Sequence, residues 1–85
     1  MALENPPWLT QRNGELRLAS DGITWFVVLD GQPHYSLTPV PVQGKYGCAI
    51  KQVNNGHPIE SKDVYSTAAE ALRGGLEDLR QALGW

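Results

Sequence analysis

The chain has 85 residues, of which 41% are hydrophobic and 19% are charged. This composition is typical of one globular domain and excludes an intrinsically disordered protein, and the small size argues against a large enclosed active site. The net charge of -2 excludes a strongly basic field over the whole molecule, of the kind that recruits nucleic acid.

The N-terminal stretch MALENPP contains two prolines and no hydrophobic periodicity, so residues 1–7 are predicted to form an extended or disordered arm. We expect a single domain over residues 8–85. The start of the chain lacks the basic and apolar regions of a secretory signal, and the lone Cys48 cannot form an internal disulfide, which favours a cytoplasmic protein. The apolar run ITWFVVL is far shorter than the roughly 20 residues that cross a bilayer, so no membrane association is expected.

Turn dipeptides punctuate the next part of the chain: NG at 13–14, DG at 21–22, DG at 30–31 and NG at 55–56. They are strong hairpin signals because Asn, Asp and Gly readily adopt positive φ. The predicted strands of this meander cover residues 15–20, 23–30, 34–42, 45–53 and 57–64. A further short strand at 8–12, pairing across the first NG turn, is left open.

Side-chain alternation assigns the faces of these strands. In the 45–53 strand, Cys48 and Ile50 fall on the predicted core side, where a free cysteine behaves as a small hydrophobe. The 34–42 strand carries Pro39 and Pro41, which cannot donate a ladder hydrogen bond. Their missing N–H groups must point away from any partner strand, which predicts an edge strand or a segment that leaves the sheet early.

Leucines recur at spacings of three and four near the C-terminus and predict an amphipathic helix over residues 68–83. Thr67 and Glu70 match a capping box, and Gly84 stands where a left-handed C-cap is wanted. Gly74 falls on the predicted water side. One flank of the helix holds only small residues, which would allow close packing: Ala68, Ala71, Gly75 and Ala82.

These elements predict an α+β fold, in which an antiparallel four- to five-stranded meander sheet carries one C-terminal helix packed on one face. No catalytic motif accompanies them. His34 and His57 lack the spacing of zinc ligands, the carboxylates are scattered along the chain, and the glycine-containing segments do not match a phosphate-binding loop. We therefore predict a protein that is not an enzyme and that uses no cofactor and no metal.

With the helix over the Cys48 side, the opposite sheet face would present basic, aromatic and small residues together. This candidate interaction face consists of Arg17, Phe26, Val28, Lys45, Gly47, Ala49 and Lys51. Such a surface suits another protein or a phosphate backbone. The alternative is that the N-terminal arm folds over Phe26 and Val28 through Trp8 and completes a second small core.

The stretch GKYGCAIKQVNNGHPIESKDVYSTAAEALRGGLEDLRQAL resembles half of a known kind of module. It is similar to the hairpin and helix of the three-stranded-sheet-plus-helix modules of AP2-type and phage-integrase amino-terminal DNA-binding domains. The matching positions are Gly44, Lys45, Tyr46, Cys48 or Ala49, Ile50, Asn55, Gly56, Thr67, Ala68, Glu70 and Ala71. The resemblance implies topology. Those modules read DNA with several arginines on the sheet, whereas this face offers Lys45, Lys51 and Arg17.

Two functions follow as hypotheses. The first is a small non-enzymatic protein-interaction module that binds a protein partner, or a second copy of itself as a homodimer, through the open sheet face or the small-residue flank of the helix. The alternative is a weak nucleic-acid-binding module that uses Arg17, Phe26, Lys45 and Lys51.

Overall fold

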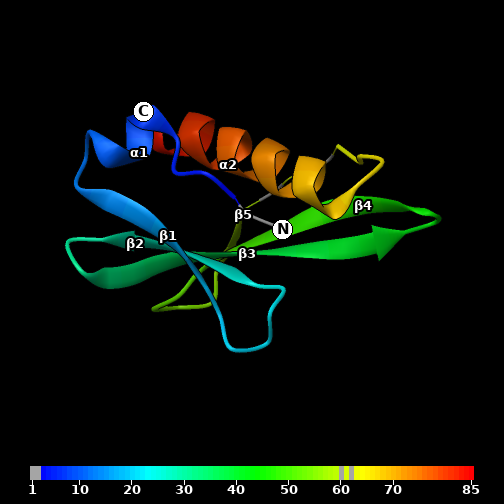
Figure 1. The fold of residues 1–85 in the computed structure, drawn as a ribbon, viewed down its shortest axis with the longest axis horizontal. Coiled ribbons are helices and arrows are strands. Elements are labelled where there is room, and N and C mark those ends of the chain that lie inside the picture. The colour runs from blue at the N-terminus through cyan, green and yellow to red at the C-terminus, as the bar shows by residue number, and fades with distance from the viewer. Residues whose placement is uncertain (1–2, 60, 62) are drawn as a thin grey trace.

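In the computed structural model, which describes residues 3–59, 61 and 63–85, a sheet forms one layer and two helices form the other (Figure 1). The elements in chain order are α1 (Pro7–Thr10), β1 (Gly14–Leu18), β2 (Trp25–Leu29), β3 (Gln32–Val42), β4 (Lys45–Gln52), β5 (Pro58–Ile59) and α2 (Ala68–Leu83). The strands pair antiparallel in the order β1-β2-β3-β4-β5. The predicted α+β fold, a meander with one C-terminal helix on one face, is confirmed.

Tight turns close two of the hairpins. Asp30 and Gly31 join β2 to β3 with φ of 51° and 79°, the pair of positive values that a type I′ turn requires. Gln43 and Gly44 join β3 to β4 in the same way, with φ of 49° and 82°. The β1–β2 connection is wider, and Asp21 organises it by accepting the backbone N–H groups of Ile23 and Thr24 at 2.9 Å each.

The central strand β3 is interior along one half and an edge along the other. Its partner β2 begins at Trp25, which pairs with Leu37. Pro39 and Pro41, further along β3, therefore face no strand on that side. Tyr46 and Gln52 of β4 donate away from β3, to Tyr65 and His57, so β3 bonds β4 through its even-numbered residues. The two prolines therefore direct their missing N–H groups to the open edge, as predicted.

The fifth strand is much shorter than the predicted 57–64. Pairing with β4 covers only Pro58 and Ile59, and it resumes at Tyr65, whose N–H and C=O both bond Tyr46 at 2.8 Å. Pro58 cannot donate to a ladder, which helps to keep this edge pairing short. Positions 60 and 62 of the predicted strand lie outside the described residues.

The short strand at 8–12 that the sequence left open does not form, because α1 occupies this place. Its first residue is Pro7, whose fixed φ suits the first turn of a helix, and the Pro6 carbonyl accepts the N–H groups of Leu9 and Thr10. The preceding arm is extended and docked: Leu3 is buried in the core, and the Asn5 side chain accepts the Leu16 N–H at 2.8 Å.

The N-terminal arm lies on the helix side of the sheet. Trp8 packs against Trp85, with ring centroids 6.0 Å apart, and the Arg12 guanidinium lies 4.3 Å from the centroid of the Trp85 ring. The alternative in which the arm covers Phe26 and Val28 through Trp8 is therefore wrong, because the aromatic partner for Trp8 is at the far end of α2.

Helix α2 has the bounds that its sequence predicts. The Thr67 hydroxyl accepts the Glu70 N–H at 3.2 Å, and Gly84 ends the helix with a φ of 75°. Trp85 N–H then reaches the Arg80 carbonyl at 3.0 Å, which completes a Schellman motif. The fully buried side chains of the core come from α1, β2, β3, β4 and α2: Leu9, Val27, Leu37, Ile50, Leu72 and Leu79.

Both glycines in the middle of α2 are in contact with side chains of other elements. A Cβ at Gly75 would overlap the Cys48 sulfur and lie 3.2 Å from Leu37, so this glycine permits close approach of helix and sheet, as its flank predicted. Gly74 corrects the sequence analysis, because it is not simply water-facing. A Cβ there would overlap the Tyr65 phenol ring and lie 2.6 Å from its Cε1 atom.

Candidate interaction face

The side of the sheet away from α2 carries no helix. Both α1 and α2 lie on the opposite side, as Figure 1 shows, and in the described part of the chain the Asp63 backbone lies against Gly47 at one place on this surface. Alternation and register, anchored by Cys48 against α2 and by the Trp25–Leu37 pair, assign its strand residues. We call this surface the outer face; its residues are Glu15, Arg17, Phe26, Val28, Ser36, Thr38, Val40, Val42, Lys45, Gly47, Ala49 and Lys51.

All seven predicted interaction residues belong to the outer face, but their exposure differs. Arg17, Lys45 and Lys51 are exposed, and Phe26 and Ala49 are half-buried. The remaining two, Val28 and Gly47, are buried and offer little surface to a partner. A Cβ at Gly47 would touch the Val42 side chain and the Asp63 backbone, so the predicted open track of small residues is closed at this point.

Four outer-face residues stand in one row across the sheet. Arg17 pairs with Phe26, Phe26 pairs with Ser36, and Ser36 pairs with Lys51. Three inter-strand spacings separate the ends of this row, which places the backbones of Arg17 and Lys51 about 14 Å apart. The row therefore presents an aromatic ring between two cations.

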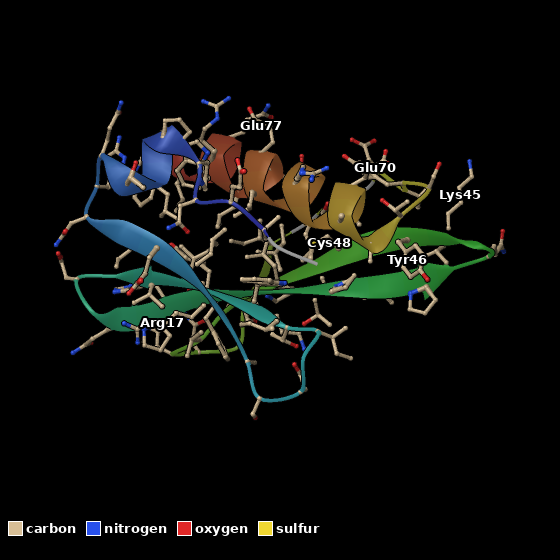
Figure 2. All side chains as sticks on the ribbon, in the orientation of Figure 1. Arg17, Lys45, Tyr46, Cys48, Glu70 and Glu77 are labelled. Carbon is tan, nitrogen blue, oxygen red and sulfur yellow. The ribbon has the colours of Figure 1, made fainter. Side chains whose placement is uncertain are left out.

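Lys45 is remote from this row. It lies six residues before Lys51 on β4, about 20 Å away along the strand. In Figure 2 Lys45 lies near the end of the β3–β4 hairpin with its side chain above the strand, whereas Arg17 lies below the sheet at its other end. Separations of this size exceed the Debye length of about 8 Å at physiological salt, so the three cations do not act as one basic patch.

The Arg17 guanidinium has a partner on the same face. It donates to the Glu15 carboxylate at 2.7 Å, two residues earlier on β1. Among the described strand residues of the outer face, Glu15 is the one acidic side chain against three cations. With Arg17 bonded to Glu15, Lys45 and Lys51 are the cations of the outer-face strands that have no carboxylate of the same strands bonded to them.

Two exposed hydrophobic residues of this face were missing from the sequence-based set. Val40 and Val42 are 39% and 42% exposed, at the part of β3 that projects past β2. They alternate with Pro39 and Pro41, and the β3–β4 register places them opposite Gly47 and Lys45. The alternation of proline and valine at 39–42 was visible in the sequence. It was interpreted there as evidence for an edge strand, and the exposure of the two valines was not inferred from it.

The helix flank does not form an independent surface. Ala71 and Gly75 are buried against the sheet, Ala68 is half-buried, and only Ala82 is exposed. The small-residue flank therefore packs inside the domain, and it is not available to a second copy of the chain. That part of the interaction hypothesis is wrong.

A hollow of about 320 Å³ lies between the N-terminal arm and α2. Apolar side chains of Leu3, Trp8 and Leu76 line it together with Arg73 and Glu77. The Glu77 carboxylate already accepts from Arg80, which lowers its pKa through that hydrogen bond. The lining thus combines apolar side chains with a carboxylate that is already hydrogen-bonded to Arg80, outside the hollow.

The cysteine is held inside the fold. Cys48 lies between β4 and α2 (Figure 2), and burial, with a smaller effect of the Asp78 carboxylate, raises the pKa of its thiol to about 12. A thiol with this pKa stays protonated at neutral pH and is a poor nucleophile. In the part of the chain that the structure describes, no three His, Cys, Asp or Glu side chains gather to hold a metal ion.

Neither helix among the described residues is long and apolar enough to cross a membrane. Comparison of the chain with known protein families, with curated proteins and with solved structures finds no match. The geometry of the outer face is therefore the basis for a functional proposal.

Proposed function

We propose that the protein is a small non-enzymatic protein-interaction module that binds its partner through the outer face. The observation that carries this proposal is the combination of an uncovered sheet surface with exposed or half-buried apolar side chains, chiefly Phe26, Val40 and Val42. Burying such side chains against a partner is favourable at roughly 25 cal/mol per Å² of apolar area. On a sheet surface that no helix covers, such side chains make a candidate interaction site.

Nucleic acid fits this face less well. A phosphate backbone gains affinity from several clustered cations, since each neutralised phosphate releases counterions. Here Arg17 is shared with Glu15, and Lys45 and Lys51 stand far apart along β4. One aromatic ring, that of Phe26, is available for base stacking, whereas the valines at the end of β3 match an apolar protein surface better.

Site-specific photo-crosslinking tests this function. Phe26 is replaced by benzoylphenylalanine in cells that express the protein natively, and a matched variant carries the same group at Glu70, which points away from the sheet on α2 (Figure 2). We expect a discrete protein adduct from position 26 and none from position 70. Both variants are first compared with the native chain by thermal unfolding.

The adduct is then identified, and the purified partner is titrated with unmodified protein. Val40→Asp should weaken this binding by about tenfold, the loss expected when one apolar contact is replaced by a buried charge. Leu18→Asp is the control, because Leu18 is 49% exposed but shares a sheet side with Trp25, away from the outer face. Crosslinks from position 26 to nucleic acid alone, or binding that Val40→Asp leaves unchanged, would overturn the proposal.

A further inference from the structure

We infer that the free edge of β1 pairs with β1 of a second copy of this chain, antiparallel and centred on Leu16, so that two sheets join into one. The inference goes beyond the proposed function, because it uses an edge of the sheet rather than the outer face. It follows from the direction of the backbone groups of β1, from the order of charges along this strand, and from the contact that covers the edge in the single chain.

The first strand of the sheet has a neighbouring strand on one side. In the described part of the chain β1 pairs with β2, and no strand lies beyond it. Asn13 and Ala19, just outside the two ends of β1, bond residues that flank β2, whereas the Leu16 N–H points the other way. Because these directions alternate along a strand, Gly14, Leu16 and Leu18 direct their N–H and C=O groups to the free edge.

The order of charges along β1 favours pairing with an identical strand. In an antiparallel pair about a two-fold axis at Leu16, Glu15 of each copy stands opposite Arg17 of the other. Because Glu15 and Arg17 direct their backbone groups towards β2, these are non-hydrogen-bonded pairs, with Cα atoms about 4.5 Å apart and side chains in close approach. Opposite charges at such positions stabilise strand pairing.

The same two side chains already bond each other within the chain. The Arg17 guanidinium donates to the Glu15 carboxylate at 2.7 Å, and the two side chains are 60% and 47% exposed, so a second copy can reach them. Strand pairing would set two such ion pairs side by side, with positive and negative groups alternating around the axis. A carboxylate can accept from more than one donor, so the bond within each chain can persist in the pair.

Only one register of the two strands has this complementarity. The neighbouring two-fold registers, centred on Glu15 or on Arg17, would place like charges opposite each other. The register centred on Leu16 also adds an apolar contact on the other side of the strand. Leu18, which is 49% exposed, would stand opposite Gly14 of the second copy and diagonal to its Leu16.

Asn5 covers this edge in the single chain. Its side-chain oxygen accepts the Leu16 N–H at 2.8 Å, and this is the central donor that a second copy would use. Asn5 is exposed, so its side chain can turn away without breaking a buried contact, and Leu16 can then exchange two backbone hydrogen bonds with its counterpart. Because the interface is one short strand, we expect a weak, concentration-dependent dimer.

Complementary charge reversals test the inference. Glu15→Arg would oppose two arginines in a homodimer, and Arg17→Glu would oppose two glutamates, so neither variant alone should associate. A mixture of the two should form a heterodimer, because opposite charges then face each other in both pairs. The double variant keeps the native net charge and should associate as the native chain does. Sedimentation equilibrium up to about 1 mM gives the masses, after thermal unfolding has shown that each variant folds.

A second pair of variants tests the cover on the edge. Asn5→Ala should tighten the native dimer at least about fivefold, because the side chain that competes for the central donor is lost. Glu4→Gln, an exposed neighbour on the same arm, should leave the dimer unchanged. In the mixture of charge variants, with one of them isotopically labelled, the amide shifts should be largest at Leu16 and Leu18.

Four results would overturn the inference. They are the absence of a heterodimer in the mixture at about 1 mM, homodimers of the single variants as tight as the native one, equal association of Asn5→Ala and the native chain, and shifts centred on Phe26 and Val40. The last result would place the second copy on the outer face. The first three leave the proposed function standing, because the crosslinking experiment tests that separately.

Discussion

Gly75 lies so close to Cys48 that a methyl group added to the glycine would overlap the cysteine sulfur and lie 3.0 Å from its Cβ. The contact joins the middle of α2 to β4, where the helix is nearest to the sheet. Gly75→Ala should therefore lower the free energy of unfolding by about 1–3 kcal/mol, because the overpacked helix must move outward. Chemical denaturation measures this loss.

The cost of Gly75→Ala should fall when Cys48 is also changed to alanine, because the sulfur that the new methyl group would overlap is then absent. The two changes are expected to be coupled because the two side chains are in contact. Equal costs of Gly75→Ala in the native and Cys48→Ala backgrounds would mean that the strain arises elsewhere. A gain of stability in the native background, as for an exposed helical glycine, would contradict the close contact.

The neighbouring Gly74 gives a different kind of test. Its Cα faces the Tyr65 ring, whose backbone is fixed by two hydrogen bonds to Tyr46, but the ring itself is at the end of a side chain that can rotate. We expect Gly74→Ala to forfeit its helix-propensity gain in the native chain. In a Tyr65→Ala background the same change should stabilise by about 0.5–1 kcal/mol. A full gain in both backgrounds, by thermal unfolding, would rule out the packing of Tyr65 on α2.

The Cys48 thiol should make stability depend on alkaline pH. Burial raises its pKa from 9.0 to about 12, so the protonated thiol stabilises the folded state fully below pH 9, and this contribution is lost as the pH rises towards 12. The stability difference between the native chain and Cys48→Ala should be constant at neutral pH and should decrease above pH 9. Urea titrations at matched pH test this, and a pH-independent difference would contradict it.

Accessibility of the same thiol can be measured independently. A thiol reagent should label Cys48 slowly in the native protein and rapidly in denaturant, because the buried, protonated thiol is unreactive. Rapid labelling of the native protein would place the cysteine on the outer face and exchange the two sides of the sheet.

The open edge of β3 gives a prediction about self-association. Pro39 and Pro41 present no N–H group there, which is one way in which proteins protect an edge strand from pairing with another chain. The double change Pro39→Val and Pro41→Thr supplies two donors and should raise the light-scattering mass with concentration. Val40→Thr is the control, because its N–H already faces β4. An unchanged mass in the double variant would mean that the edge is protected by other means.

The sequence predicted α2 residue for residue because its signals are local. Each leucine is three or four residues from the next, so the pattern depends on neighbours within about one turn. Thr67 and Gly84 cap the two ends of the helix. The environment of Gly74 could not be predicted in the same way. A helical wheel describes neighbours on the helix, whereas Tyr65 reaches Gly74 only because its backbone pairs with Tyr46 on β4.

The outer face shows a similar limit. Alternation correctly assigned Arg17, Phe26 and Lys51 to one side of the sheet, since strand geometry fixes the side of each residue. Exposure depends on neighbouring segments, and for this reason Gly47, beneath Val42 and the Asp63 backbone, was wrongly expected to be open. The short helix α1 was missed because two consecutive prolines suggest an extended chain when their neighbours in space are unknown.

The stacking of Trp8 on Trp85 has a consequence for native-state fluctuations. In a meander each strand pairs with the next in sequence, so the sheet can re-form from local hairpins, whereas the docking of α1 on the end of α2 joins residues at opposite ends of the chain. Such a contact is the most costly in loop entropy and the easiest to release without breaking the sheet. Hydrogen exchange should therefore show the amides of Leu9 and Thr10 opening well before those of Leu37 and Ile50, in a partial unfolding that Trp85→Ala would make more frequent.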